Sequence, residues 1–451
     1  MSKKRSSFSS RIGFVLAAAG SAVGLGNLWR FPYLAAKYGG GTFLVIYLIL
    51  VLTFGYSLMT AEITLGRKTR LSAVGAYGKI DKRFNFIGLL SCLVPIIIIP
   101  YYCVIGGWIL KYLGVFVTDG AKTTAADSYF TDFITSPLQP YVLMVIFLTI
   151  TAVIVSFGVK RGVENASRIM MPLLIALSIA ISIYSMTRPG AWEGVKYYLT
   201  PHFSDVSLNT LLGALGQMFF SMSLAMGIMI TYGSYMMDDT DIEKSVSQIE
   251  IFDTGIAFLA GLMIVPSVFA FSGGDEEALN AGSGLMFVTM PKVFASMGFG
   301  TVIGIAFFVL VFFAALTSSI SLYETVVSIF CDKFHISRKL SCVVTYVICL
   351  VLGFFSALGY GTLSGIAPLG MSFLDFFDFI SNSILMPTVA LLTCLFLGWI
   401  VGLDTILDEV KKNSSFKREK MFRVMMRWIA PIFLIAILIS SVLSALGIIS
   451  I

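Results

Sequence analysis

The sequence predicts an all-α polytopic membrane protein built from two inverted repeats with discontinuous helices. Three observations carry this prediction: the composition, the recurrence of long apolar segments, and two apolar segments that are interrupted by glycines. Of the 451 residues, 57% are hydrophobic and only 12% are charged, and the mean hydropathy is +0.91. These values are typical of proteins that expose most of their helical surface to lipid.

Apolar segments long enough to cross a hydrocarbon core of ~30 Å recur eleven times along the chain. The first has no small-residue cleavage pattern behind it, so we interpret it as a mature helix rather than a signal peptide. The predicted spans are 11–36, 41–66, 86–116, 141–158, 166–187, 210–236, 246–272, 298–332, 338–360, 372–400 and 426–450.

The basic residues predict the topology. With the N-terminus in the cytoplasm, most of the 31 lysines and arginines fall on cytoplasmic segments, as the positive-inside rule requires. An odd number of spans then places the C-terminus outside the cell. The net charge of +6 is explained by topology and needs no nucleic-acid partner. The basic segments are 1–11, 67–83, 160–168, residue 244, 333–339 and 411–427.

No residue pattern indicates an enzyme. The six cysteines lie in or beside apolar spans without metal-type spacing, and we interpret them as small packing residues. His202 and His335 are isolated in the sequence, and there is no Ser-His or Cys-His arrangement for nucleophilic catalysis. The cysteines are Cys92, Cys103, Cys331, Cys342, Cys349 and Cys394.

Two apolar segments are interrupted where a lipid-exposed helix should be continuous. The stretch 20–32 contains three glycines and a proline, and 210–236 contains Gly213, Gly216 and Gly227. Each glycine weakens a helix by about 1 kcal/mol relative to alanine. Two interrupted helices five spans apart indicate an inverted-repeat transporter with its site between them. We therefore expect one repeat over 1–190, a second over 191–400, and a cytoplasmic loop with an eleventh helix over 401–451.

Polar side chains within these spans are candidate functional residues. Asp253 lies in an apolar context and must protonate, pair or hold a cation. Asn27 and Arg30 lie in the first interrupted segment, whereas Thr317 and Ser318 follow an apolar run in the eighth span. Hydroxyls alone are a weak signal because they often bond to the preceding helical turn.

Four motifs resemble those of the neurotransmitter:sodium symporter family, especially its bacterial amino-acid transporters with eleven helices. They are Gly-Ser-Ala-Val-Gly-Leu-Gly-Asn-Leu-Trp-Arg-Phe-Pro at 20–32, Gly-Gly-Gly-Thr-Phe at 39–43, Gly-Gln-Met-Phe-Phe-Ser-Met-Ser-Leu at 216–224 and Ala-Leu-Thr-Ser-Ser-Ile-Ser at 315–321. The resemblance covers residues 5 to 400. It implies a leucine-transporter-like fold of five plus five helices, with discontinuous first and sixth helices and one extra helix.

The resemblance also implies two sodium sites, because unwound backbone supplies carbonyl oxygens that a regular helix does not. At the first site Ser221 and Asp253 stand where the leucine-transporting relative has threonine and asparagine. The first site is expected to use Ala22, Asn27, Ser221 and Asp253 together with the substrate carboxylate. The second site is expected to use Gly20, Val23, Ala314, Thr317 and Ser318.

The implied substrate site lies beside the first sodium, between the interrupted helices. Gly24 occupies the position where amine-transporting relatives have aspartate, so a substrate carboxylate is expected to be required. The pocket has no charged side chain, which favours apolar or aromatic substrates, and the flexible Met226 admits varied groups. The expected substrate-binding residues are Ala22, Leu25, Gly26, Ile98, Tyr102, Phe220, Ser221, Ser223, Met226, Gly227, Ser318 and Leu322.

Two gates are expected to enclose this site. Arg30 and Asp378 would pair on the outer side, above a thin lid of Tyr102 and Phe220. On the inner side Arg5 would pair with Asp332, supported by Ser234 and Tyr235. Gly162 and Pro172 in the fifth span would let its cytoplasmic end unwind and admit water to the second sodium site.

Together these observations predict a sodium-coupled symporter that imports hydrophobic or aromatic L-amino acids by alternating access across the plasma or inner membrane. The resemblance also implies chloride independence. Chloride-dependent relatives bind the anion with groups that match Tyr47, Gln217 and Ser221 together with an asparagine and a serine, and these last two positions are Asp253 and Ala257 here. The alternatives are a non-transporting amino-acid sensor on the same scaffold and a symporter for a different small amino acid. The expected partners are the amino acid, two sodium ions and the lipid bilayer, and a monomer is expected.

Overall fold

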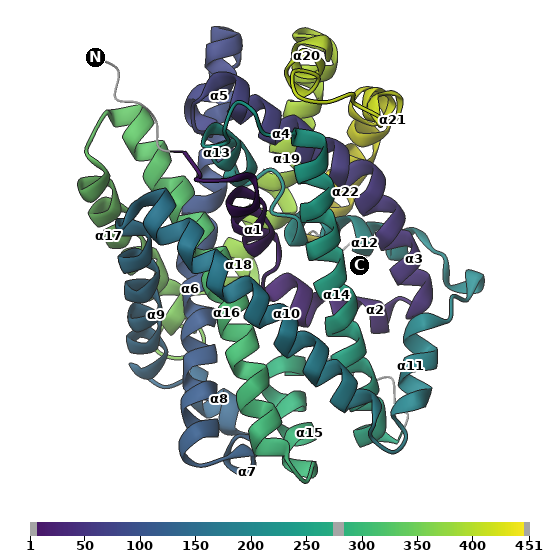
Figure 1. The fold of residues 1–451 in the computed structure, drawn as a ribbon. Helices are drawn as coiled ribbons and strands as arrows, with labels where there is room; N and C mark the ends of the chain where they lie inside the picture. The colour runs from purple at the N-terminus through teal and green to yellow at the C-terminus, as the bar shows by residue number, and fades with distance from the viewer. Residues whose placement is uncertain (1–6, 274–283, 446–451) are drawn as a thin grey trace.

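The computed structural model describes residues 7–273 and 284–445. In this part of the chain the molecule is a bundle of helices without β-strands (Figure 1). Nine of the described helices are long and apolar enough to cross a membrane. They are Gly41–Thr69, Lys82–Thr118, Gln139–Ser156, Val159–Met186, Ile242–Ser272, Gly300–Phe334, Arg338–Leu358, Phe373–Ile400 and Glu419–Leu443.

The labels of Figure 1 divide some of these spans at π-helical turns. The helices within the spans are α3 (Gly41–Leu50), α4 (Tyr56–Thr69), α6 (Asn85–Thr118), α9 (Gln139–Ser156), α10 (Asn165–Met186), α14 (Ile242–Ser272), α16 (Gly300–Phe334), α17 (Arg338–Leu358), α18 (Phe373–Asp378), α19 (Met386–Leu395), α21 (Glu419–Val424) and α22 (Ala430–Ala445). The π-helical turns are η1 (Gly26–Arg30), η2 (Val51–Gly55), η4 (Val159–Glu164), η7 (Leu285–Thr289), η9 (Phe379–Leu385), η10 (Phe396–Ile400) and η11 (Met425–Ile429).

Two expected spans are broken helices. α1 (Arg11–Ala22) is followed after a short break by the helical segment Gly26–Lys37, which includes α2 (Phe31–Lys37), and the two parts meet at a bend of 52°. The expected span 210–236 is divided between α12 (Leu208–Ser221) and α13 (Ile228–Ser234), each too short to cross a bilayer alone. By length and composition the described chain therefore gives up to ten spans. The expected count of eleven is not confirmed.

Short helices cover the two ends of the bundle (Figure 1). One end carries α5 (Ala73–Ile80) and α20 (Asp404–Val410), and we call it the α20 end. The opposite α15 end carries α7 (Ala121–Thr124), α8 (Tyr129–Ile134) and α15 (Met290–Ser296). The polar residues of 117–140 predict an external loop, and in the structure this segment contains the two helices α7 and α8. The acidic residues of 272–297 likewise predict an external lid; this segment lies partly outside the described residues, and its second half forms η7 and α15.

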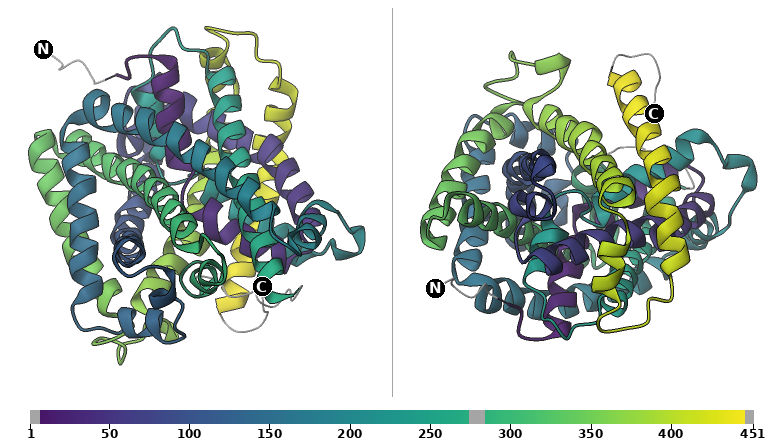
Figure 2. Two further views of the ribbon diagram at one scale, coloured as in Figure 1. Left: turned by 60° about the horizontal axis from the view of Figure 1, so that its bottom comes forward. Right: turned by 90° about the horizontal axis from the view of Figure 1, so that it is seen from above.

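The long helices α6 and α16 pack against each other and form the framework on which the broken helices rest. α9 and α17 pack on both of these helices, and α14 contacts α1, α4 and α10. The turned views in Figure 2 show the same bundle from two other directions, with α22 along one side of it. Both broken helices thus lie among intact helices rather than in lipid.

α4 and α13 cross with their backbones almost in contact. A Cβ atom at Gly66 would lie 1.9 Å from the carbonyl oxygen of Ile230, and one at Gly233 would lie 2.2 Å from that of Ile63. Neither distance is possible for real atoms, so any side chain at these two positions would force the helices apart. Glycine is therefore required here by packing.

We expect Gly66→Ala to lower the thermal unfolding temperature of the purified protein, because separating the two backbones costs about 1–3 kcal/mol. Gly255→Ala in α14 is the matched control, since nothing lies within 4 Å of a Cβ atom placed there. Thermal unfolding in detergent measures both variants. Equal unfolding temperatures for Gly66→Ala and Gly255→Ala would contradict the close crossing.

Candidate functional site

The break in α1 is held in place by one asparagine. α1 ends at Ala22, Val23 has extended backbone torsions, and the chain becomes helical again at Gly26. The side-chain oxygen of Asn27 accepts a hydrogen bond from the backbone N–H of Gly24 at 3.0 Å. This bond satisfies a donor that the break would otherwise leave unpaired in a buried position.

The same asparagine reaches Asp253 of α14. Asn27 Nδ2 donates to Asp253 Oδ1 at 2.7 Å, and Ser221 Oγ donates to the two carboxylate oxygens at 2.8 and 3.0 Å. The hydroxyl of Tyr47 completes the set, at 3.3 Å from Asp253 Oδ2 and 3.2 Å from Ser221 Oγ. All four side chains are buried. The structure thus brings together three residues predicted for the first sodium site, with Ala22 buried at the end of α1 nearby.

The residues that match the chloride ligands of relatives do not all contact the Asp253 carboxylate. Tyr47 contacts Asp253 directly, and Ala257 is buried one helical turn farther along α14. Gln217 does not contact the carboxylate: its Nε2 donates to the carbonyl of Gly26 at 2.8 Å, and its Oε1 has no partner. A carboxylate with a methyl side chain beside it is a poor environment for a second anion.

Residues predicted for the second sodium site lie where α1 contacts α16. Ser318 Oγ donates to the carbonyl of Val23 at 3.4 Å. Thr317 Oγ1 donates to the carbonyl of Ala314 at 3.1 Å, and a Cβ atom at Gly20 would lie 3.3 Å from the Cβ of Thr317. All five residues are therefore at one junction, whose oxygen atoms are carbonyls and hydroxyls. Such oxygens are the ligands that hard cations prefer.

The break between α12 and α13 has unusual backbone torsions. Within 222–227, Ser223 and Ala225 have positive φ angles of 53° and 59°, which non-glycine residues rarely adopt. Two contacts hold this conformation: Ala225 N donates to Glu62 Oε1 at 2.8 Å, and Ser223 Oγ donates to the carbonyl of Ser21 at 3.0 Å. Sequence reasoning missed Glu62. The available signal was a glutamate within the apolar second span.

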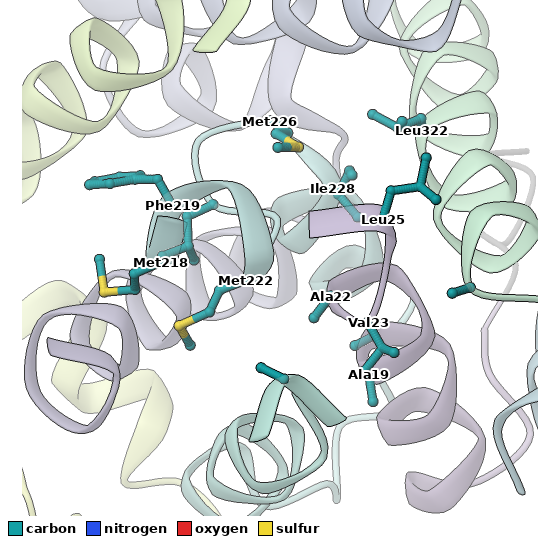
Figure 3. Packing of buried hydrophobic residues seen from close by; sticks show 14 of the residues in the cluster. Ala19, Ala22, Val23, Leu25, Met218, Phe219, Met222, Met226, Ile228 and Leu322 are labelled. Atoms are coloured by element: carbon teal, nitrogen blue, oxygen red, sulfur yellow. The ribbon is translucent and has the colours of Figure 1, made fainter. Parts of the chain in front are cut away.

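A small pocket lies between the two breaks. Figure 3 shows four of its lining side chains, those of Leu25, Met226, Ile228 and Leu322. Its volume is about 20 Å³, which is space for about one water molecule. An amino acid therefore enters only when the lining side chains move apart. None of the lining residues carries a charged side chain. They are Ser21, Ala22, Gly24, Leu25, Gly26, Ile98, Tyr102, Phe220, Ser223, Met226, Ile228, Ser318 and Leu322.

Ten of the twelve residues expected to bind substrate line this pocket. Ser221 lies instead on the Asp253 carboxylate, and Gly227, with a φ of 72°, starts α13. Sequence reasoning did not include Ser21, Gly24 and Ile228 among the lining residues.

Gly24 leaves no room for a larger residue in this pocket. A Cβ atom there would lie 2.6 Å from Ser318 Oγ and 3.0 Å from the hydroxyl of Tyr102. The same hydroxyl accepts a hydrogen bond from Leu25 N at 3.3 Å. An aspartate at position 24 would displace these groups. With glycine at this position, the pocket offers no carboxylate to a substrate ammonium group.

On the α15 side of the pocket, a cavity of about 330 Å³ contains the residues of the expected outer gate. Arg30 and Asp378 both line it, but no ion pair joins these two described residues in this conformation. The Arg30 guanidinium lies 5.5 Å from the ring centre of Phe220. Asp378 instead accepts hydrogen bonds from Tyr101 at 3.0 Å and Asn382 at 2.6 Å. Phe220 lines both cavity and pocket, and thus separates them.

The expected inner gate is only partly described. Arg5 lies outside the described residues, and Asp332 accepts a hydrogen bond from Ser72 N at 2.7 Å. Ser234 Oγ donates to the carbonyl of Thr231 at 2.5 Å within its own helix.

A larger network at the same end was not anticipated from the sequence. Tyr235 donates to Glu324 at 2.8 Å, and Arg338 forms an ion pair with the same carboxylate. The N–H of Phe8 donates to the carbonyl of Tyr235 at 3.1 Å, and its ring packs edge-on against Tyr232 and Tyr235. The described residues before α1 therefore pack against α13 and the following Tyr235 at the α20 end.

The start of the fifth span contains another buried carboxylate, that of Glu164. Glu164 accepts a hydrogen bond from Ser9 N at 2.8 Å and pairs with Arg168 at 2.6 Å. Gly162, one of the two residues expected to allow unwinding, lies against the end of α9, where a Cβ atom would be 2.0 Å from the Ile154 carbonyl oxygen. The start of this span is therefore tied both to the chain before α1 and to α9.

Comparisons with known proteins agree with this geometry. The model of the sodium:neurotransmitter symporter family matches residues 5–139 and 125–448. An uncharacterised sodium-dependent transporter of Bacillus subtilis (strain 168), YhdH, is 35% identical over 96% of this chain and 97% of its own length. An uncharacterised sodium-dependent transporter of Methanocaldococcus jannaschii is 34% identical over 96% of this chain and 90% of its own length.

A solved structure is also similar. The crystal structure of MhsT in complex with L-phenylalanine superposes with a TM-score of 0.88, at 38% sequence identity, and the match covers 97% of this chain and all of that one.

Proposed function

Because the chain belongs to the sodium:neurotransmitter symporter family, we propose that it imports hydrophobic or aromatic L-amino acids together with sodium and without chloride. The chain is a multi-pass membrane transporter and not an enzyme. One observation carries the finer proposal: a buried carboxylate with three hydrogen-bond donors lies beside a closed, uncharged pocket at the ends of two broken helices.

In this proposal Asp253 supplies the fixed negative charge of the first sodium site. Asn27 and Ser221 contribute side-chain oxygens, Ala22 contributes a carbonyl, and the substrate carboxylate completes the shell. A sodium ion there would link α1, α12 and α14. Its binding would therefore require a bound substrate and both helix breaks in the conformation described here. The second ion would bind at Gly20, Val23, Ala314, Thr317 and Ser318, linking α1 to α16.

In this proposal the two ends of the bundle face opposite sides of the membrane. We assign the α20 end to the cytoplasm, because the basic segments 67–83 and 411–427 lie there. Entry from the α15 end would need Phe220 to move and the other lining side chains of the pocket to separate, after which Arg30 and Asp378 would approach each other and close the cavity. Opening the α20 end would require the network around Glu324 to break. Binding free energy that differs between these states would drive the change.

The pocket sets the class of substrate in this proposal. Its lining is apolar apart from hydroxyls and backbone, so a charged substrate side chain would lose its hydration without gaining a partner. The backbone at Leu25 and Gly26 and the hydroxyl of Tyr102 would bind the substrate carboxylate at the start of a helical segment. L-Phenylalanine bound to MhsT is consistent with this class.

We expect substrate binding to depend on sodium and to weaken at least about tenfold in Asp253→Ala and Asn27→Ala, because a hydrogen bond to a charged group contributes about 1.5–3 kcal/mol. Binding of radiolabelled phenylalanine in sodium against potassium measures this dependence. Asn209→Ala, at the exposed start of α12, is the matched control and should bind like the wild type. Full-affinity binding without sodium in either site variant would show that this ion assignment is wrong.

Substrate specificity should depend on the substrate carboxylate and on the absence of charged side chains in the pocket lining. Trp, Tyr, Phe, Leu, Ile and Met are expected to compete with labelled phenylalanine, whereas lysine and phenethylamine are not. Phenethylamine is the sharpest comparison, because it differs from phenylalanine only by the absent carboxylate. Competition by the two compounds at similar concentrations would contradict the role assigned to Leu25, Gly26 and Gly24. Uptake into vesicles along a sodium gradient also separates a transporter from a sensor that only binds.

Uptake should be equal in chloride and gluconate. A chloride ion about 4 Å from the Asp253 carboxylate would be repelled by about 4 kcal/mol at an effective dielectric constant of about 20. The double variant Asp253→Asn with Ala257→Ser should acquire a chloride requirement, because it removes the charge and adds a hydroxyl. Wild-type uptake that stops in gluconate would overturn this explanation.

A further inference from the structure

A buried carboxylate that neither sodium site uses lies one helical turn from Asp253. Glu250 of α14 is 2% exposed. It precedes Asp253 by three residues, so the two side chains project from the same face of the helix. Because α14 begins at the α20 end, Glu250 lies between Asp253 and that end.

Only one oxygen of this carboxylate has a partner in the described structure. Oε2 accepts a hydrogen bond from Arg418 at 3.3 Å, whereas Oε1 is buried without a partner. Two hydroxyls in the same region, those of Tyr56 and Thr254, are also buried and unpaired. A buried ionised carboxylate with a single long contact is poorly stabilised. A proton on Oε1 would neutralise it and convert that oxygen into a hydrogen-bond donor.

The loop between α20 and α21 covers this carboxylate. The Arg418 guanidinium lies 4.4 Å from the ring centre of Tyr56, and the ring of the buried Phe416 lies 6.4 Å from the same ring. The backbone of Lys417 donates to Glu243 at the start of α14, at 3.1 and 3.2 Å. Water at the α20 end therefore reaches Glu250 when this loop moves away.

Few charged groups face Glu250. On its own helix these are Asp253 and, toward the loop, Glu243. The loop contributes Arg418, and α4 contributes the phenol of Tyr56. From α1, Arg11 donates to Gln248 rather than to Glu250. Arg418 is thus the single cation that contacts Glu250 in the described chain, and a proton at Oε1 competes with it.

We propose that Glu250 is a proton-binding site that controls the release of sodium at the α20 end, an inference that rests on the function proposed above. An ionised Glu250 adds negative charge near Asp253 and favours a bound sodium ion. A proton taken from water at the α20 end removes that charge, frees Arg418 and the loop, and weakens sodium binding. The proton is bound and released without any covalent change.

The test is sodium binding as a function of pH, measured on the purified full-length protein by the sodium concentration that gives half-maximal thermal stabilisation. Between about pH 8.5 and 5.5, the half-maximal concentration should rise at least about threefold in the wild type. Glu250→Gln should show the weaker, low-pH value throughout this range. Glu243→Gln, which touches the same loop, should behave like the wild type.

A second variant decides the question if Glu250→Gln does not fold. Arg418→Gln removes the cation that opposes protonation, so its transition should move to higher pH. Wild-type pH dependence in Glu250→Gln, or an unmoved transition in Arg418→Gln, would overturn this inference alone. A wild-type protein that sodium does not stabilise at any pH would instead overturn the proposed function.

Discussion

The hydrogen bonds to the Asp253 carboxylate are the interaction on which the site depends. Their donors come from three separate elements. Asn27 lies in the segment after the first break, Ser221 is the last residue of α12, and Tyr47 belongs to α3. A buried carboxylate without donors is far less stable than one with three. The two helix breaks are therefore coupled, because each supplies a partner to the same charged group.

The free energy cost of breaking two helices among apolar neighbours is offset by intact helices. Tyr102 of α6 accepts the N–H of Leu25, and Glu62 of α4 accepts the N–H of Ala225. Without such partners each unpaired N–H would cost several kcal/mol in these surroundings. The close crossing of α4 and α13 also places Glu62 beside the second break. Packing of the framework thus determines where unwound backbone is tolerated.

The sequence predicts the breaks and the central charged group better than it predicts their partners. Glycines at 20–32 and the isolated Asp253 are local signals, and the break in α1 and the Asp253 cluster lie at those positions. The contact between Glu62 and Ala225 and the ion pair of Arg338 with Glu324 depend on which helices meet, and no local pattern encodes that. The eleven predicted spans are not all confirmed by length and composition, because the predicted span 210–236 is divided into two helices that are each too short to cross a bilayer.

The two ends of the bundle differ in the contacts that enclose the pocket. At the α15 end Phe220 lines both the cavity and the pocket, and no ion pair joins the described residues Arg30 and Asp378. At the α20 end a buried glutamate, an arginine and the segment before α1 form one connected network. Removing one partner of a buried ion pair is strongly destabilising, whereas moving one aromatic ring is not. In the proposed transport cycle the α20 end would therefore open only when ligand binding compensates for the loss of its network.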